Sequence, residues 1–325
     1  MARRGGTRRH AAHQGGARSR GPHESGQGPA LSAAAPGGPG TGDAPARVTI
    51  VAVTYNSGAV IEGFLAALPE GVSLVVVDNA SRDGTADRVA ASAPAARIVR
   101  SLVNRGFGAG CNAGLDFVET DYALLLNPDA RLASGALAAL VAVADACPDA
   151  AIVAPAIAGA GGRRVRSYDV AQQRRRAFPR KRGAEAWPEG PVCVDFVSGA
   201  AMLVRRADRL RFDEALFLYY EDDEICAAAR ARGRSVIYVP DAVAEHEGGR
   251  STPPSLRVRW LKAFHMARSR RIYHARHGRP EVAGRLLHHA GKALGHAITF
   301  QGGKVVEDVA GFAGTLSVRA DRGGA

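Results

Sequence analysis

Three short apolar segments of this chain each end on polar side chains, and this pattern constrains the fold more than any other feature. The segments are residues 48–53, 74–77 and 123–126, and they lead into Thr54, Asp78 and Asn127-Pro128-Asp129 respectively. Such runs are typical of the buried strands of a parallel sheet. Because ligands of open parallel sheets collect at the carboxyl ends of the strands, we expect these polar groups to share one edge and form a binding site.

Between residues 47 and about 156, the sequence alternates these runs with Ala-rich segments of helical spacing. The alternation predicts βαβ units and an α/β fold built around a parallel sheet. We expect the helices over residues 60–68, 85–91, 108–119 and 134–146.

The second half of the chain is less regular. Residues 158–190 are rich in Gly, Arg and Pro with little periodicity, which predicts a long excursion from the fold. Regular structure is expected to resume with apolar segments at 192–197 and 200–204, a helix over 222–232 and a strand over 235–239. After Ser255, apolar residues among arginines predict a basic amphipathic helix.

Composition and cysteine spacing indicate in which cellular compartment the protein is found. Residues 1–46 hold arginines among Gly, Ala, Ser and Pro with almost no bulky apolar side chain, which predicts a disordered basic tail. They lack the apolar core of an export signal, and no apolar run is long enough for a membrane span, so we expect neither. The four cysteines are widely spaced without a C-x-x-C pair, which disfavours a zinc site or a disulfide framework and favours a reducing cytosol.

The formal net charge is +12, and beyond the tail the basic residues cluster at 174–176, 180–182 and 257–279. Such a charge is compatible with nucleic acid, a membrane surface or an anionic substrate. No helix-turn-helix, zinc-finger or RNP motif accompanies the clusters, so we expect no nucleic-acid partner. Two interpretations stay open, namely solvated Arg-rich loops or an anionic surface as the partner.

Two polar turns are candidates for nucleotide binding. Residues 78–85 collect carboxylate, amide and hydroxyl groups suited to a base edge and its ribose, although capping of the next helix by Asp83 or Thr85 explains part of the pattern. Residues 104–114 place a Gly-rich turn before a helix, where amide groups favour anions. The glycines do not match the dinucleotide-binding fingerprint, and no P-loop sequence occurs.

Four consecutive acids, residues 221–224, stand at the head of a predicted helix. The helix dipole favours acids there, but four in succession exceed that need and repel one another, as expected of a general base or of a site that faces a cation. His246, flanked by Glu245 and Glu247 after a strand, is a candidate cation ligand. An isolated histidine is nevertheless more often structural.

Six ordered motifs resemble glycosyltransferase family 2, most closely its rhamnosyltransferase-like members. They are Val53-Thr54-Tyr55-Asn56, residues 77–85, Asn104-x-Gly106-Phe107, Leu126-Asn127-Pro128-Asp129, Ser198-Gly199-Ala200, and Phe212-Asp213-Glu214 followed by Tyr220-Glu221-Asp222. The resemblance implies a GT-A fold, with a mixed, mainly parallel sheet flanked by helices. It implies a catalytic domain over 47–250, with a nucleotide-binding part (47–130) and an acceptor-side part (131–250), between the 1–46 tail and a helical extension over 251–325.

The resemblance also implies an inverting transfer of a sugar from a nucleotide diphosphate to a hydroxyl. Asp222 would be the catalytic base beside Glu221, and Asp129 and His246 would hold Mg²⁺ or Mn²⁺. The nucleotide sugar would contact Thr54, Tyr55, Asn56, Asp78, Asn79, Ser81, Asn104, Gly106 and Asn127.

The chain departs from the family pattern at two positions. Asn127 replaces the first Asp of the metal-binding D-x-D triplet, a change frequent in the rhamnosyltransferase-like branch. Asp223 is an additional acid, so which carboxylate of residues 221–224 is the base stays open.

Subgroup likeness favours a dTDP-linked rhamnose donor, and UDP-linked sugars stay possible. The acceptor is expected to be a cell-envelope glycan or a polyprenyl-diphosphate-linked glycan at the cytoplasmic face of the plasma membrane. There, a basic segment with Trp260, Leu261 and Phe264 would meet anionic lipid. Alternatively, these apolar residues pack the helix onto the catalytic domain.

Two other functions are less compatible with the sequence. A sugar-nucleotide-forming nucleotidyltransferase should carry an amino-terminal Gly-rich basic loop, whereas the first strand here leads into residues 54–57, Thr-Tyr-Asn-Ser. A non-catalytic basic protein that binds membrane or nucleic acid on a transferase fold is disfavoured because Asp78, Asp129, Asp222 and His246 are all intact.

Overall fold

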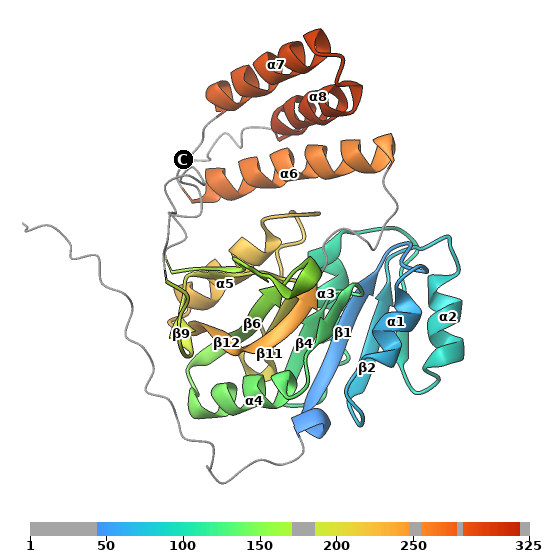
Figure 1. The fold of residues 1–325 in the computed structure, drawn as a ribbon, viewed down its shortest axis with the longest axis vertical. Coiled ribbons are helices and arrows are strands. Elements are labelled where there is room, and N and C mark those ends of the chain that lie inside the picture. The colour runs from blue at the N-terminus through green and yellow to red at the C-terminus, as the bar shows by residue number, and fades with distance from the viewer. Residues whose placement is uncertain (1–43, 171–185, 247–254, 278–281, 319–325) are drawn as a thin grey trace, which may run out of the picture.

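A computed structural model describes residues 44–170, 186–246, 255–277 and 282–318 of the chain. Residues 1–43 of the predicted tail and part of the 158–190 excursion therefore lie outside the described residues, as does the expected domain boundary near 250. The last residues of the predicted tail instead begin a short 3-10 helix, Ala44–Arg47. Within the described part, the molecule is an α/β unit with three further helices at its carboxyl-terminal end (Figure 1).

Within the described residues, the central sheet has ten strands and is mixed: most strands of its main path run in the same direction, and one antiparallel strand lies near its centre, as the resemblance to a mainly parallel mixed sheet implied. Its main path runs β3-β2-β1-β4-β11-β6-β12-β5, with β7 beside β6 and β9 beside β12. The strands are β1 (Val48–Thr54), β2 (Ser73–Asp78), β3 (Arg97–Arg100), β4 (Tyr122–Leu126), β5 (Ala130–Leu132), β6 (Ala150–Ala158), β7 (Arg164–Val165), β9 (Val192–Cys193), β11 (Ala201–Arg205) and β12 (Ser235–His246). A separate pair joins β8 (Tyr168–Asp169) to β10 (Phe196–Val197).

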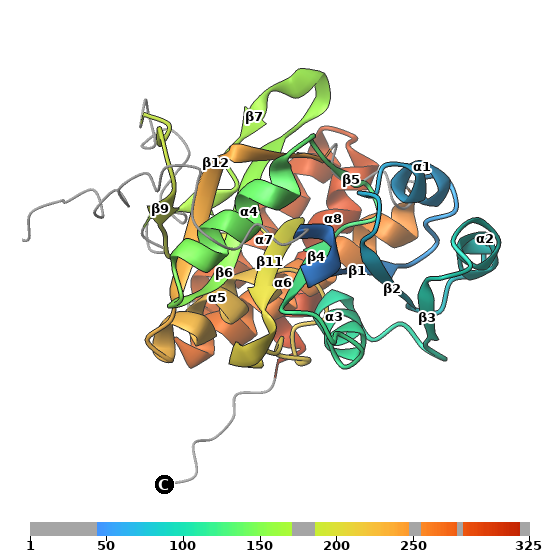
Figure 2. The same cartoon turned by 90° about the horizontal axis from the view of Figure 1, so that it is seen from below.

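Five helices cover the two faces of this sheet, and Figure 2 shows them on either side of it. They are α1 (Ile61–Ala66), α2 (Thr85–Ser92), α3 (Phe107–Leu115), α4 (Ala136–Ala146) and α5 (Glu221–Ala231). Apolar residues of α1, α2 and α4 belong to one core cluster with the sheet, and those of α3 and α5 belong to the other. The helices predicted near these positions are therefore confirmed, with ends shifted by a few residues.

The predicted basic helix after Ser255 is confirmed as α6 (Leu256–Arg276), and two helices follow it, α7 (Val282–Ile298) and α8 (Gly302–Leu316). The Ser255 hydroxyl caps α6 by accepting the Val258 amide at 3.2 Å. In Figure 1, α6 lies between the sheet and the α7–α8 pair. Among the described helices, none is long and apolar enough to cross a membrane.

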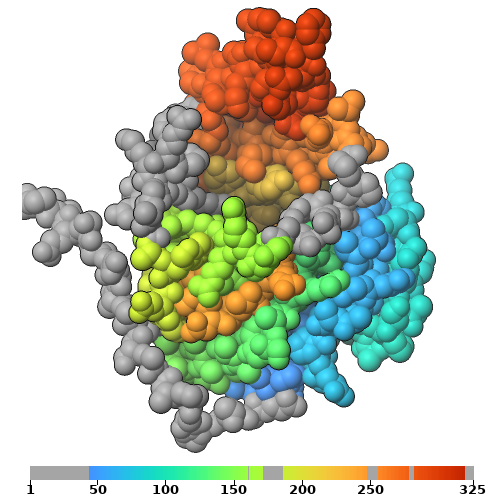
Figure 3. All heavy atoms as spheres, in the orientation of Figure 1, coloured from blue at the N-terminus to red at the C-terminus, as the bar shows by residue number. Residues whose placement is uncertain are grey.

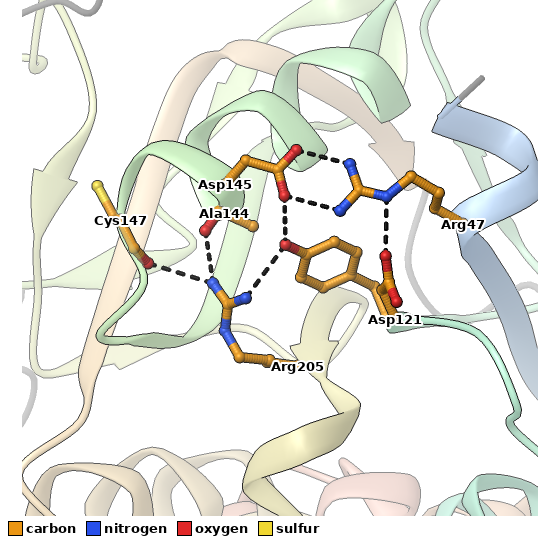
Figure 4. A network of polar contacts seen from close by, with 7 residues as sticks. Arg47, Asp121, Ala144, Asp145, Cys147 and Arg205 are labelled. Carbon is orange, nitrogen blue, oxygen red and sulfur yellow. Dashed lines mark hydrogen bonds and ion pairs between the residues drawn. The ribbon is translucent and has the colours of Figure 1, made fainter. Parts of the chain in front are cut away.

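A network of charged residues closes the amino-terminal edge of the sheet (Figure 4). The Arg47 guanidinium donates to both Asp145 oxygens at 2.7 and 2.9 Å and to Asp121 at 2.8 Å. The Tyr122 hydroxyl donates to Asp145 at 2.6 Å, and Arg205 donates to that hydroxyl at 3.2 Å. Hydrogen bonds from Arg47 hold the pKa of Asp145 below its ordinary value. The network ties β1, β4, β11 and α4 together at the edge opposite the polar strand ends.

Candidate active site

The first two strands bring Thr54 and Asp78 together because β1 and β2 pair in parallel with these residues opposite each other. The Thr54 hydroxyl donates to Asp78 Oδ1 at 3.2 Å, and the Ser81 amide donates to Asp78 Oδ2 at 3.2 Å. Both Thr54 and Asp78 are buried. The Asp78 carboxylate is thus held in one orientation at the carboxyl edge of the sheet.

The turns that follow β1 and β2 are bonded to each other through Asn56 and Ser81. The Asn56 amide donates to Ser81 Oγ at 2.8 Å, and the Arg82 amide donates to Asn56 Oδ1 at 2.8 Å. Asn56 has a φ of 52°, in the left-handed region that asparagine tolerates better than most residues. Tyr55 is half-buried beside them. These contacts bring the predicted nucleotide contacts of the two turns into one surface.

Asp83 stabilises the second turn, as the capping interpretation expected. It accepts the Thr85 amide at 3.1 Å and the Gly58 amide at 2.8 Å. Burial raises the pKa of Asp83, but the hydrogen bonds from Thr85 and Gly58 outweigh it and hold that pKa below its ordinary value. Part of the 78–85 motif is therefore accounted for by local structure.

Asn79 and Asn104 shape the turn before α3. The Asn79 side chain donates to Asn104 Oδ1 and to the Gly106 carbonyl, each at 2.9 Å, and accepts the Arg105 amide at 3.0 Å. Asn79 is 2% exposed. These contacts give Asn79 a positioning role for the turn, whereas the sequence assigned it to the nucleotide itself.

The glycines of the 104–114 segment serve close packing. A Cβ at Gly106 would collide with the Phe217 carbonyl, and Cβ atoms at Gly110 and Gly114 would press against valines of β1. The amides of residues 105–107 already donate to Asn79, Asn104 and Phe217. The expectation that donor amides of this turn meet an anion is therefore wrong for these three amides, because each is bonded within the protein.

Asp129 and His246 lie side by side, as the sequence predicted. Strand β5 pairs antiparallel with the end of β12 and sets His246 opposite Ala130, next to Asp129. Asp129 Oδ1 is 3.1 Å from His246 Nε2, and the side-chain nitrogen of Asn127, Nδ2, is 3.5 Å from the same ring atom. The Asp129 and His246 side chains are 6% and 20% exposed.

This pair fits a divalent cation that also binds phosphate. A carboxylate oxygen and an imidazole nitrogen suit Mg²⁺ or Mn²⁺. The described residues contain no group of three or more His, Cys, Asp or Glu side chains arranged to hold a metal by themselves. A cation here would consequently need ligands from a bound substrate, which is the arrangement usual for Mg²⁺ with nucleotide phosphates.

The four acids at the start of α5 have different surroundings. Glu221 and Asp223 are buried, 6% and 3% exposed, and Glu224 is 2.8 Å from His277 of α6. Asp222 is half-buried, and its described hydrogen bonds come from two backbone amides, Gly199 at 3.4 Å and Asp223 at 3.0 Å. Within the described residues, Asp222 is thus the member of the group that combines partial exposure with hydrogen bonds from backbone amides alone.

The Ser198-Gly199-Ala200 segment connects this acid to the metal pair. The Gly199 amide donates to Asp222 Oδ2, and one residue later the Ala200 carbonyl accepts the Asn127 amide at 3.0 Å. Asn127 in turn lies beside His246. The candidate base at the start of α5 is therefore linked through this segment and Asn127 to His246 at the end of β12 and to Asp129 beside it.

Sequence reasoning missed the strained backbone immediately before α5. Tyr219 and Tyr220 both have a φ of 67°, which is uncommon for bulky residues. Helix α6 holds this segment: Ser269 donates to the Leu218 carbonyl at 3.0 Å, Arg268 donates to the Ala215 carbonyl at 2.8 Å, and the Phe217 and His265 rings stack at 4.1 Å. Periodicity cannot reveal such a contact, because its partners lie about 50 residues apart.

Comparisons with known proteins identify the family of the chain. The model of Glycosyl transferase family 2 matches residues 49–210. The chain is 30% identical over 241 residues to N-acetylglucosaminyl-diphospho-decaprenol L-rhamnosyltransferase of Mycobacterium tuberculosis, covering 62% of this chain and 76% of that protein.

Similar solved structures include S. aureus TarS 1–349, at 17% identity and a TM-score of 0.48, covering 70% of this chain and 72% of that chain. Another is mannosyltransferase PcManGT from Pyrobaculum calidifontis in complex with GDP-Man and Mn²⁺, at 23% identity and a TM-score of 0.48, covering 68% of this chain and 62% of that one. On the sequence match and the family model, the chain belongs to glycosyltransferase family 2 and is an enzyme that transfers a sugar from a nucleotide-sugar donor.

Proposed function

We propose that this enzyme transfers rhamnose from a dTDP-linked donor to a hydroxyl of a polyprenyl-diphosphate-linked glycan, with inversion at the anomeric carbon. The observation that carries the proposal is the link from Asp222, through the Ser198–Ala200 segment and Asn127, to the pair of His246 and Asp129. The choice of sugar and acceptor is supported by the mycobacterial relative, whose name specifies rhamnosyl transfer to a diphospho-decaprenol acceptor.

The donor would lie along the carboxyl edge of β1, β2 and β4. Thr54, Tyr55 and Asp78 would meet the base, and Asn56 and Ser81 would shape the adjoining surface, while Asn79, Asn104 and Gly106 keep the neighbouring turn in place. The oriented Asp78 carboxylate can accept a hydrogen bond from the imide N–H of a thymine or uracil ring. Asn127 lies between this edge and the metal pair.

Transfer would follow a single displacement. Asp222 takes the proton of the acceptor hydroxyl while its oxygen attacks the anomeric carbon. The bond from that carbon to the diphosphate oxygen breaks, and its electron pair leaves with the nucleotide diphosphate. Asp129 and His246 would hold Mg²⁺ or Mn²⁺, which supplies positive charge for the leaving diphosphate. Glu221, the buried residue before Asp222, is the alternative candidate for the base.

A donor panel tests the proposal. The purified enzyme is incubated with Mg²⁺, a short-chain polyprenyl-diphospho-N-acetylglucosamine acceptor and, in turn, dTDP-rhamnose, UDP-N-acetylglucosamine, UDP-galactose and GDP-mannose. We expect a product heavier by one deoxyhexose with dTDP-rhamnose and little product with the others. Transfer from another donor alone would refute the rhamnosyl assignment, and transfer to free glycans but not to the lipid-linked glycan would refute the acceptor.

Membrane contact is part of the proposal, with the enzyme at the cytoplasmic face of an anionic membrane. The described residues between 255 and 317 include ten Lys or Arg and two carboxylates, a charge that anionic lipid attracts. On α6, Trp260 is 39% exposed, whereas Leu261 and Phe264 are half-buried. Further exposed apolar side chains lie on α7, where Leu287, Leu294 and Ile298 share one face and are 75%, 65% and 69% exposed.

Vesicle co-sedimentation tests this contact. We expect binding to vesicles with anionic lipid that falls with added salt, and a clear loss of binding in Leu287→Glu with Leu294→Glu. Leu102→Glu is the matched control, because Leu102 is 98% exposed on the catalytic part of the molecule. Binding that ignores lipid charge, or that Leu102→Glu reduces equally, would contradict this part of the proposal.

A further inference from the structure

A cavity of about 230 Å³ lies between the three carboxyl-terminal helices and the residue that precedes α5. Its walls come from α6, α7 and α8, and Tyr220 closes one side. Figure 3 shows the carboxyl-terminal helices stacked over the rest of the molecule, with the surface hollowed beneath α6. None of the residues assigned above to the donor or the metal lines the cavity.

The lining is rich in cationic groups. Arg270, Arg271 and Arg285 contribute to it, together with His274 and His289. Arginine presents a planar fork of donors that suits phosphate oxygens in pairs. Three arginines from two helices around one small cavity are the kind of donor set that recognises a diphosphate.

Two carboxylates also line the cavity, and each already has a partner. Glu307 is 3.3 Å from the Arg259 guanidinium. Asp308 is 2.6 Å from His296 and 3.8 Å from His289. The lining thus holds three arginines against two carboxylates, so the balance of its formal charge is positive. Burial lowers the pKa of His289, so we count it as a neutral hydrogen-bonding group at pH 7.

The position of the cavity relates it to the acceptor. Tyr220 lines it, and the next two residues of the chain are Glu221 and the candidate base Asp222. The Tyr220 ring lies 5.4 Å from the Tyr273 ring and 6.2 Å from the His274 ring, measured between centroids. The cavity lining and the candidate base are therefore only two residues apart along the chain.

We infer that this cavity binds the diphosphate of the acceptor, so that the first sugar of the acceptor projects past Tyr220 toward Asp222. The inference rests on the proposed function for the identity of the acceptor. The ligand chemistry is a diphosphate, which a lipid-linked glycan and free pyrophosphate share. The exposed apolar face of α7 belongs to the same group of helices and would give the lipid chain a path toward the bilayer.

Direct binding tests the inference without turnover. The full chain is saturated with dTDP and Mg²⁺ to fill the donor site and is then titrated calorimetrically with farnesyl diphosphate, inorganic pyrophosphate and farnesol. We expect farnesyl diphosphate to bind most tightly, pyrophosphate to bind more weakly and farnesol not to bind. Failure of both diphosphates to bind once dTDP is present, or binding of pyrophosphate alone, would overturn the inference.

Arginine variants locate the binding. Arg270→Gln on α6 and Arg285→Gln on α7 should each weaken farnesyl diphosphate binding by about tenfold or more, because each removes a charge-assisted hydrogen bond. Arg257→Gln is the matched control, since Arg257 is an exposed residue of α6 outside the cavity. Arg271 is left intact because it also donates to the Thr315 carbonyl between α6 and α8. Unchanged binding in both variants, with thermal melting like the wild type, would contradict the inference.

Two variants on different helices keep the test informative if one of them fails to fold. Kinetics separate this inference from the proposed function. If the enzyme glycosylates the lipid-linked acceptor but Arg270→Gln and Arg285→Gln leave its KM unchanged, the function stands and the cavity assignment falls. If diphosphates bind in the cavity but no polyprenyl-linked acceptor is glycosylated, the assignment stands and the acceptor must be sought among other diphosphates.

Discussion

The amino and carboxyl edges of the central sheet, where its parallel strands begin and end, carry similar residue types in different pairings. At the amino-terminal edge, Arg47, Asp121, Asp145, Tyr122 and Arg205 bond to one another (Figure 4). At the carboxyl edge, Asp129 lies 3.1 Å from a histidine, and Asp222 accepts hydrogen bonds from backbone amides. The first cluster pairs its carboxylates with arginine, whereas the second presents carboxylates to a histidine and to amides.

From this difference we expect the first cluster to stabilise the fold and the second to act on a ligand. A carboxylate held by a bidentate arginine gains stability from that pair and has little capacity left for a substrate. A carboxylate that accepts only backbone amides can still take a proton or bind a cation. Mutations at the carboxyl edge should therefore lower activity, and mutations at the amino edge should lower stability.

The largest effect is expected at Asp222. Asp222→Asn should keep donor binding and lower kcat by about 10²–10⁴-fold, the usual cost of removing a positioned general base. Donor binding is followed by calorimetry and kcat by product mass. Glu224→Gln is the matched control in the same helical turn and should leave kcat nearly unchanged. A normal kcat in Asp222→Asn together with a large loss in Glu221→Gln would assign the base to Glu221.

A somewhat smaller loss is expected at the metal pair. Asp129→Ala should lower kcat/KM by about 10²-fold, because a bound cation contributes several kcal/mol of charge stabilisation. It should also weaken the binding of dTDP in the presence of Mn²⁺ but not in the presence of a chelator. Asp241→Ala, an exposed acid on the same strand as His246, serves as the control. Full activity of the wild-type enzyme in excess chelator would remove the metal from the account.

A mutation at the amino edge should lower the stability of the protein rather than its activity. Asp145→Asn removes the acceptor of the Arg47 fork and should lower the free energy of unfolding by about 1–2 kcal/mol, a figure discounted for solvent screening because the Asp145 side chain is 37% exposed. Since the folded-state pKa of Asp145 is depressed, this contribution is present near neutral pH and is lost as the pH falls through that pKa. Asp121→Asn, which loses one exposed contact, should cost less. A loss of activity in folded Asp145→Asn would contradict the claim that the amino edge contributes to stability alone.

The smallest effect concerns the helix that covers the carboxyl edge. Burial, followed by the charge of Arg268, lowers the pKa of His265 to about 4. Its neutral form is favoured in the folded state, so its contribution is present above its ordinary pKa of about 6.5 and is lost as the pH falls toward 4. Wild-type melting temperature should fall over this range by a few degrees more than that of His265→Phe. Equal acid sensitivity of the two proteins would refute the role of His265.

Much of the sheet and its functional edge can be predicted because the signals are local. An apolar run followed by a polar turn is visible in a few residues, and β1, β2 and β4 end where that pattern places them. The family resemblance then pairs Asp129 with His246, which the β5–β12 register brings to 3.1 Å. The resemblance also assigns the base to Asp222, and the structure adds that its neighbours Glu221 and Asp223 are buried.

Other features depend on distant packing. Strand β6 contains Pro155, which interrupts its pattern, and β12 continues to His246 through a register shift after Val239 where the sequence predicts an end. Glycines disfavour helices α7 and α8 locally, yet a Cβ at Gly311 or Gly314 would collide with His289 or with the Phe264 carbonyl. Close helix packing therefore outweighs the poor helix propensity of glycine.

Crystals of the enzyme grown with dTDP and Mn²⁺ test the central claim most directly, through anomalous scattering from the manganese. The account predicts one strong manganese peak within bonding distance of Asp129 and His246, with the nucleotide diphosphate beside it and the base near Asp78. Nucleotide bound at any other part of the molecule, or manganese bound away from Asp129 and His246, would contradict the assignment of the carboxyl edge as the active site.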